Sequence, residues 1–384
     1  MKKLSLSNVA IAIIAILLTQ SCSKDVSVIT PNSGGTVSEK LDDDGYVYTQ
    51  SNAPEVNGIL IYAQHPDGSL TFDGSVASGG AGTGTSLGNQ GAVVLNEDHT
   101  MLFAVNAGDN TVSSFSVDAE GQLQLLATAA TGGILPVSVT YHQPFLFVVN
   151  ARSCNISGFM VGADGSMALI PNSMNPLSGD KVDPAQIGFS PDGNTLVVTE
   201  KASNKITSFK VDSTGATSAP ISIKAVGRTP FGFQFKRDNN FIVSNASGGI
   251  PTQGTATSYY INNDGTINLN ADGPEPNHQT ASCWVALGFK NGKYAYVTNT
   301  ASNTISSYSI DNTGSFEVKE QVAATTEAGP TDVVVSGGDQ KFLYVINSGS
   351  HTIGGYVRNS DGTLTFLSTI GDLPASATGL AAYK

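Results

Sequence analysis

Residues Lys293 to Phe316 read KYAYVTNTASNTISSYSIDNTGSF. Two stretches of this segment, 294–298 and 304–310, alternate between residue types with the period of two that a pleated strand requires. Small polar residues separate them, and a second turn follows in which Gly314 suits a backbone with positive φ. Two strands cannot bury a hydrophobic face alone, so this unit needs neighbours.

The same unit recurs about every 50 residues along the chain. Each copy has an apolar strand, a short polar turn, a strand rich in Ser and aromatic residues, and a turn that ends in glycine. The turn glycines are Gly68, Gly121, Gly165, Gly215, Gly265, Gly314 and Gly362. A third strand precedes each unit, starting with residue 90 in the earliest example, and a fourth follows each turn glycine. Four strands per repeat of this length are typical of a β-propeller.

Seven copies of the apolar strand are present, beginning near Tyr46, Leu102, Phe145, Thr195, Phe241, Tyr294 and Phe342. The first copy has no inner strand before it, and the final segment, 378–383, has inner-strand character but no strand after it. We therefore predict an all-β fold, a seven-bladed β-propeller of four-stranded antiparallel blades over residues 45–384. The C-terminal strand would join the N-terminal blade, with Leu380 beside Val47, and so remove a sheet edge.

Composition excludes several classes of function. The 384 residues include 19 Lys and Arg against 31 Asp and Glu, a net charge of -12, which argues against a nucleic-acid partner. The Gly-rich segment 79–88 lacks the Lys-Ser/Thr of a phosphate-binding loop. No zinc-binding spacing is present, so we expect no metal and no cofactor. Cys154 and Cys283 fall in the third and sixth repeats, and we expect no disulfide between them.

The start of the chain predicts export. Residues 1–22 combine Lys2 and Lys3 with a short apolar stretch, as in a signal peptide. Cys22 and the polar, acidic residues after it resemble the lipidation site of Bacteroidetes lipoproteins. This resemblance implies a lipid anchor on Cys22 in the outer membrane, with the protein displayed at the surface; the alternative is a plain secretory signal. Residues 23–44 would form a flexible tether, and we expect a monomer that contacts the membrane through the anchor only.

The motif Tyr-Val-Thr-Asn at 296–299, together with Ser-Pro-Asp-Gly at 190–193, resembles the YVTN-repeat and lactonase-type seven-bladed propellers. That resemblance implies the propeller fold over 45–384. The family includes sugar-lactone hydrolases, muconate lactonising enzymes and many binding proteins. Lactonase members carry His or Arg where inner strands begin, in patterns such as Gly-Pro-Arg-His. The matching stretches here, 182–186 and 227–231, keep no His, and Arg228 lies on the other side of its proline. No catalytic residue is therefore carried over.

The longer connections, 77–89, 170–183, 245–255 and 270–282, all fall on one face of the expected propeller, here called the loop-rich face. Long loops favour function, so we expect a site at the channel mouth on this face. The candidate ligand-binding residues are Arg228, Trp284, Asp183, Asp332, Gln186, Phe231 and His278.

Each informative candidate has two interpretations. Trp284 could stack on a sugar ring or pack between blades. Arg228 could clamp a carboxylate or phosphate, or pair with Asp183 or Asp332. Asp332 could act as a general base or a calcium ligand, or cap turn amides. His278, alone on a loop, could simply be solvated.

Two functions remain open at this point, and the sequence does not decide whether the protein is an enzyme. One is an envelope or surface lipoprotein that binds a glycan or a protein partner through the loop-rich face and channel mouth. The alternative is a lactonase-like hydrolase or muconate-cyclase-like lyase that acts on a small acidic sugar or lactone in the channel mouth. A structural assembly module is a third interpretation.

Overall fold

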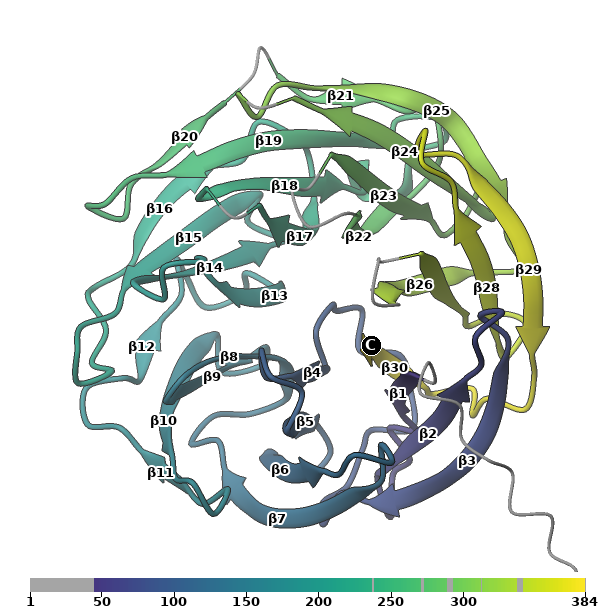
Figure 1. Cartoon of the computed structure of the whole chain (residues 1–384). Helices are drawn as coiled ribbons and strands as arrows, with labels where there is room; N and C mark the ends of the chain where they lie inside the picture. Colours follow the sequence, from purple (N-terminus) through teal and green to yellow (C-terminus); the bar gives the residue numbers. More distant parts are fainter. Residues whose placement is uncertain are drawn as a thin grey trace, which may run out of the picture. The chain divides into compact units, whose positions relative to one another are not determined.

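The computed structural model describes residues 45–236, 238–270, 273–288, 293–311, 313–336 and 341–383. They form seven antiparallel sheets, the blades, arranged around a central axis (Figure 1). The predicted seven-bladed propeller is therefore confirmed. Residues 1–44, which carry the predictions of a signal peptide, a lipidated Cys22 and a tether, lie outside the described residues.

Blades 2 to 4 follow one another along the chain, each built from the axis outward. Blade 2 contains β4 (Val93–Leu95), β5 (Met101–Asn106), β6 (Thr111–Val117) and β7 (Leu123–Ala130). Blade 3 contains β8 (Pro136–His142), β9 (Phe145–Asn150), β10 (Asn155–Val161) and β11 (Met167–Leu169), and β12 (Asn175–Pro176) also pairs with β10. Blade 4 contains β13 (Pro184–Phe189), β14 (Thr195–Glu200), β15 (Lys205–Lys210) and β16 (Ile221–Lys224).

Blades 5 to 7 repeat the pattern. Blade 5 contains β17 (Pro230–Phe235), β18 (Asn240–Asn245), the 3₁₀ helix η1 (Ser247–Gly249), β19 (Thr255–Ile261), β20 (Ile267–Leu269) and β21 (Glu275–Pro276), which pairs with β19. Blade 6 contains β22 (Ser282–Gly288), β23 (Tyr294–Asn299), β24 (Thr304–Ile310) and β25 (Phe316–Thr325). Blade 7 contains β26 (Pro330–Ser336), β27 (Phe342–Asn347), β28 (Thr352–Arg358) and β29 (Leu364–Ile370).

Blade 1 closes the ring from both ends of the chain. It contains β1 (Gly45–Gln50), β2 (Gly58–Gln64), β3 (Leu70–Ala77) and, as its inner strand, β30 (Thr378–Tyr383). The predicted pairing of β30 with the N-terminal blade is confirmed, but the register differs by two residues. Leu380 lies opposite Thr49, and Ala382 lies opposite Val47.

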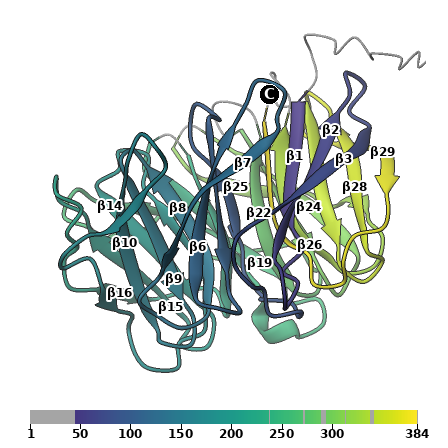
Figure 2. The ribbon, with the colours of Figure 1, turned by 90° about the horizontal axis from the view of Figure 1, so that it is seen from below.

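Strands run between two faces of the ring (Figure 2). The loop-rich face carries the outer-to-inner and second-to-third connections, including η1. The opposite face, here called the turn face, carries the inner-to-second and third-to-outer turns. None of the described residues forms a helix that could cross a membrane.

The hydrophobic core lies between neighbouring blades rather than inside any one of them. One cluster, for example, packs Phe103 and Val105 of blade 2 against Val139, Leu146 and Val148 of blade 3. Because each blade exposes an apolar face to its neighbour, a single blade could not bury its own hydrophobic surface.

A hydrogen bond between neighbouring blades accompanies this packing. A hydroxyl on a second or third strand donates to the carbonyl of the turn glycine in the next blade. Among the described residues, the pairs are Tyr48–Gly121, Ser114–Gly165, Ser208–Gly265, Ser258–Gly314, Tyr296–Gly362 and Tyr344–Gly68.

The asparagine that ends the YVTN-like strands bonds to the neighbouring strand of its own blade. Asn299 Nδ2 donates to Thr304 Oγ1 at 3.1 Å and to Ser306 Oγ at 2.8 Å on the next strand. Asn106 and Asn245 make the same pair of bonds in blades 2 and 5. The repeated motif is therefore explained by buried polar groups that must be satisfied.

Tyr344→Phe should lower the free energy of unfolding by about 1 kcal/mol, because it leaves the Gly68 carbonyl without its 2.7 Å donor. Tyr308→Phe is the matched control. The Tyr308 hydroxyl is buried and makes no hydrogen bond within the described ranges, so its removal should be neutral or stabilising. Urea denaturation measures both variants, and equal losses would contradict the role given to the inter-blade bond.

Candidate functional site

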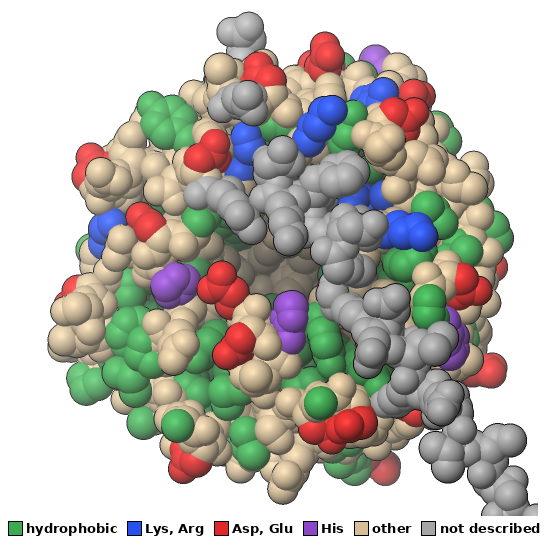
Figure 3. Space-filling view, viewed as in Figure 1, with side chains coloured by type: hydrophobic (Ala, Val, Ile, Leu, Met, Phe, Trp, Pro, Cys, Tyr) green, Lys and Arg blue, Asp and Glu red, His purple; other side chains and the backbone are tan. Residues whose placement is uncertain are grey.

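A pocket of about 290 Å³ lies on the axis of the propeller, inside the ring of inner strands. Residues from β8, β13, β17, β26 and β30 line it, together with residues 90–95. Gln90, which precedes β4, and Asp332, near the start of β26, are buried, whereas Tyr141 and Phe235, near the ends of β8 and β17, are partly exposed. Inner strands end at the turn face, so the pocket opens there, and Figure 3 shows a hollow at the centre of this face.

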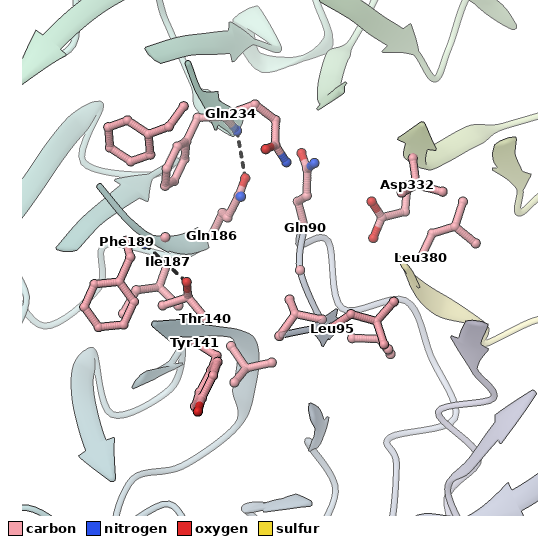
Figure 4. Close-up of a pocket in the computed structure, with 18 of the residues that line it drawn as sticks. Gln90, Leu95, Thr140, Tyr141, Gln186, Ile187, Phe189, Gln234, Asp332 and Leu380 are labelled. Atoms are coloured by element: carbon pink, nitrogen blue, oxygen red, sulfur yellow. Dashed lines mark hydrogen bonds between the residues drawn. The ribbon is translucent and has the colours of Figure 1, made fainter. Parts of the chain in front are cut away.

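Three carboxamides and one carboxyl group face the interior of the pocket. The side chains of Gln90, Gln186 and Gln234 point toward its middle, and Asp332 faces them from β26 (Figure 4). Carboxamides both donate and accept hydrogen bonds without carrying charge. The described residues that line the pocket include no Lys, Arg or His, so it offers neutral polar groups and one acid.

Asp332 is the ionisable group whose environment stands out. Its side chain is 2 % exposed, Oδ1 accepts a hydrogen bond from the Val333 amide at 3.0 Å, and Oδ2 makes none within the described part of the chain. Burial raises the pKa of this carboxyl to about 7, although the nearby amides of Val333, Leu380 and Gly91 partly offset the effect. The pocket therefore holds a carboxyl that titrates near neutral pH, as a general base requires.

Residues 88–90 close the opposite, loop-rich end. Lys201 Nζ donates to the Gly88 carbonyl at 2.6 Å, and Trp284 Nε1 donates to the Asn89 carbonyl at 2.6 Å. Gln90 Nε2 donates to the Val285 carbonyl at 2.7 Å. Because Lys201, which follows β14, the strand β22 and the segment before β4 belong to blades on different sides of the axis, these bonds close the channel at this end. They also explain why β4 begins at Val93 rather than at Gln90.

Two of the predicted site residues, Gln186 and Asp332, line the pocket. Asp183, Phe231 and Trp284 gather instead around Lys201, on the loop-rich side of residues 88–90. Lys201 forms an ion pair with Asp183 at 3.3 Å and lies 5.1 Å from the centre of the Phe231 ring. That ring packs on Trp284 at 4.7 Å. The group is internally bonded and packed.

Arg228 and His278 are exposed, and the ion pair of Asp183 goes to Lys201 rather than to Arg228. Arg228, Trp284, Asp183 and Asp332 therefore do not converge on one point. The pocket also opens on the turn face, not at the loop-rich mouth expected from loop length, because residues 88–90 cross the axis there. A ligand-binding role for the seven candidate residues stays a prediction.

Three residues of this region, Gln90, Gln234 and Lys201, were not among the candidate residues, and Gln90 was expected only as the start of an inner strand. Gln234 had a signal, since it interrupts the aromatic run of the inner strand Pro-Phe-Gly-Phe-Gln-Phe at 230–235. Lys201 had none, because it follows its strand as an ordinary turn residue.

Among the described residues, no group of three or more His, Cys, Asp and Glu side chains is arranged so that it could hold a metal ion. Cys154 and Cys283 are both free and buried, and burial raises the pKa of Cys283 to about 12, which keeps it a thiol at neutral pH.

The fold and the site define a seven-bladed propeller with an axial pocket closed at one end. Residues 53–176, 166–250 and 278–374 match the family described as lactonase, seven-bladed β-propeller. These matches cover more than half of the chain, which therefore belongs to the lactonase-type propeller family.

Solved structures agree with the fold. A protein from Lactobacillus plantarum is 18% identical over 89% of this chain and 100% of its own, with a TM-score of 0.72. The periplasmic gluconolactonase of Pseudomonas aeruginosa is 17% identical over 87% and 98%, with a TM-score of 0.68. A candidate 6-phosphogluconolactonase from Bacteroides fragilis is 19% identical over 88% and 98%, with a TM-score of 0.67. Comparison with curated protein sequences gives no match.

Proposed function

We propose that this protein hydrolyses a small, uncharged sugar lactone in the axial pocket, with Asp332 as the general base. The observation that carries the proposal is the Asp332 carboxyl, which is buried at the closed end of a pocket with one oxygen unbonded within the described residues. Membership of the lactonase-type family and the fold shared with a gluconolactonase support the choice of reaction.

The lining supports a neutral substrate rather than the acidic sugar expected from the sequence. A carboxylate or phosphate on the ligand would meet Asp332 without any Lys, Arg or His among the described lining residues. Sugar hydroxyls, in contrast, suit the carboxamides of Gln186 and Gln234, whereas the carboxamide of Gln90 is bonded to the Val285 backbone. At about 290 Å³ the pocket is just below the range of about 300–1,000 Å³ for ligand sites, which favours a single ring.

The proposed reaction uses one water molecule and no cofactor. Asp332 Oδ2 accepts a proton from water while the water oxygen attacks the lactone carbonyl carbon. The tetrahedral intermediate then collapses, the bond between the carbonyl carbon and the ring oxygen breaks, and the proton held by Asp332 passes to the departing oxygen. The product is an open-chain hydroxy acid, and the carboxylate is regenerated.

Asp332→Asn should lower kcat/KM for glucono-δ-lactone by about 10²- to 10⁴-fold, because it removes the base while keeping the side-chain shape. Arg228→Ala is the control, since Arg228 is exposed and does not line the pocket. Rates are measured by pH-stat with spontaneous hydrolysis subtracted. Wild-type kcat/KM should rise with pH through about 7. Absence of turnover above background, or equal effects of the two substitutions, would refute the proposal.

The same carboxyl links stability to pH. Its pKa is 3.8 ordinarily and about 7 in the fold, so between these values the folded protein keeps a proton that the unfolded chain has released. Asp332 therefore destabilises the fold progressively as pH rises through this window, and fully above it. Asp332→Asn should raise Tm relative to wild type at pH 8 and change it little at pH 4. Thermal melts at both values test this, and a pH-independent difference would contradict the raised pKa.

We also propose that the propeller is exported as a lipoprotein, on the support of residues 1–22 and Cys22. Mass spectrometry of the membrane-bound protein before and after Cys22→Ser tests the lipid anchor. If wild type and Cys22→Ser are both released without a lipid, residues 1–22 act as a plain secretory signal and the lipoprotein proposal is wrong.

A further inference from the structure

Three consecutive inner strands, β8, β13 and β17, are joined by one hydrogen-bonding pattern. In this pattern the side chain of the third residue of one strand accepts a bond from the amide of the fourth residue of the next strand. Ser138 Oγ accepts from the Ile187 amide at 3.2 Å, and Gln186 Oε1 accepts from the Phe233 amide at 2.7 Å. These bonds tie β8 to β13 and β13 to β17.

The pattern ends at β17, because its third residue, Gly232, has no side chain. The next amide, that of Val285 on β22, is met instead by Gln90 from the other side of the channel. Gln90 Oε1 accepts from the Val285 amide at 3.1 Å, and Gln90 Nε2 donates to the Val285 carbonyl at 2.7 Å. A Cβ built on Gly232 would overlap Gln90 Oε1, so the glycine provides the space that Gln90 fills.

The backbone around Gln90 is fixed to several blades as well. The Gln90 amide donates to the Ala185 carbonyl at 3.0 Å. Asn89 Nδ2 donates to the Val137 carbonyl, and Thr378 Oγ1 donates to Asn89 Oδ1 at 3.1 Å. Bonds to blades 1, 3, 4 and 6 hold this segment in place, so it is a fixed closure rather than a mobile lid.

We propose that Gln90 is a specificity-determining residue: seated in the gap left by Gly232, it closes the axial channel beside Asp332 and limits the pocket to ligands of one ring that enter from the turn face. The proposal rests on the function proposed above for its substrate class. The closure itself is a property of the fold and is measured without any substrate.

Trp284 reports on the closure, because it is the only Trp of the chain and its indole N–H is bonded to Asn89. Gln90→Ala should raise the acrylamide quenching constant of its fluorescence about twofold at a temperature far below unfolding, since local opening admits the quencher. Gln234→Ala is the matched control: it removes a carboxamide from the same pocket without breaking the cross-channel bonds, and should leave quenching unchanged. Equal quenching in wild type and Gln90→Ala would overturn the closure.

A double-mutant cycle tests the pairing of Gln90 with Gly232. Gly232→Ala should lower Tm because the new methyl group displaces Gln90. In a Gln90→Ala background that loss should shrink by at least about half, since only crowding against the Cys283 carbonyl remains. Additive losses would show that the two positions are independent and would overturn the pairing.

Specificity is measured as the ratio of kcat/KM for glucono-δ-lactone to that for the lactone of a disaccharide acid. Gln90→Ala should reduce this ratio about tenfold by removing the wall that excludes the longer ligand. A ratio unchanged despite increased quenching would overturn the role in specificity. If wild type hydrolyses neither lactone, both the proposed function and the specificity role of Gln90 are wrong. The fluorescence quenching and the double-mutant cycle still decide whether Gln90 closes the channel.

Discussion

The ring depends on the contact between one blade and the turn of the next. At six interfaces of the described chain, a hydroxyl reaches the carbonyl of a turn glycine in the following blade. Glycine is required there for two reasons. Its φ is positive, as at Gly121 and Gly362, and a Cβ at either position would overlap the ring of Tyr46 or Tyr294 in the preceding blade. The repeat in the sequence therefore reflects the contacts between blades as well as the strands within each blade.

This dependence explains why the fold could be predicted from the sequence. Alternation, turn glycines and the asparagine of the YVTN-like strands are local signals, and each occurs in many copies. The ring closure followed from two incomplete ends, a first blade without an inner strand and a final strand without a blade. The register of β30 was wrong by two residues, because Leu380 and Thr49 belong to strands whose alternation fits several neighbouring pairings equally.

The site could be predicted only in part. Gln186 and Asp332 were found because they are polar residues at the start of inner strands, where side chains must face the axis. The closed end was missed because its partners are remote in sequence: Gln90 and Val285 are separated by 195 residues. Loop length pointed to the loop-rich mouth, but a long loop can also be used to fill a channel, as residues 88–90 do. No local pattern distinguishes these two uses.

Two buried carboxyl groups show how an acid with a structural role differs from one that is free to bind a ligand. Glu200 replaces the asparagine of the repeat and is fully buried, yet it accepts hydrogen bonds from Ser178, from Ser203 at 2.6 Å and from Thr207 at 2.7 Å. Both of its oxygens are satisfied by donors placed around them. Asp332 is buried to a similar extent but leaves one oxygen without a donor in the described structure. Burial alone is therefore a poor guide to function in this propeller. The informative feature is a buried polar atom that makes no hydrogen bond within the described residues and that faces a pocket, because a bound molecule can then complete its bonding.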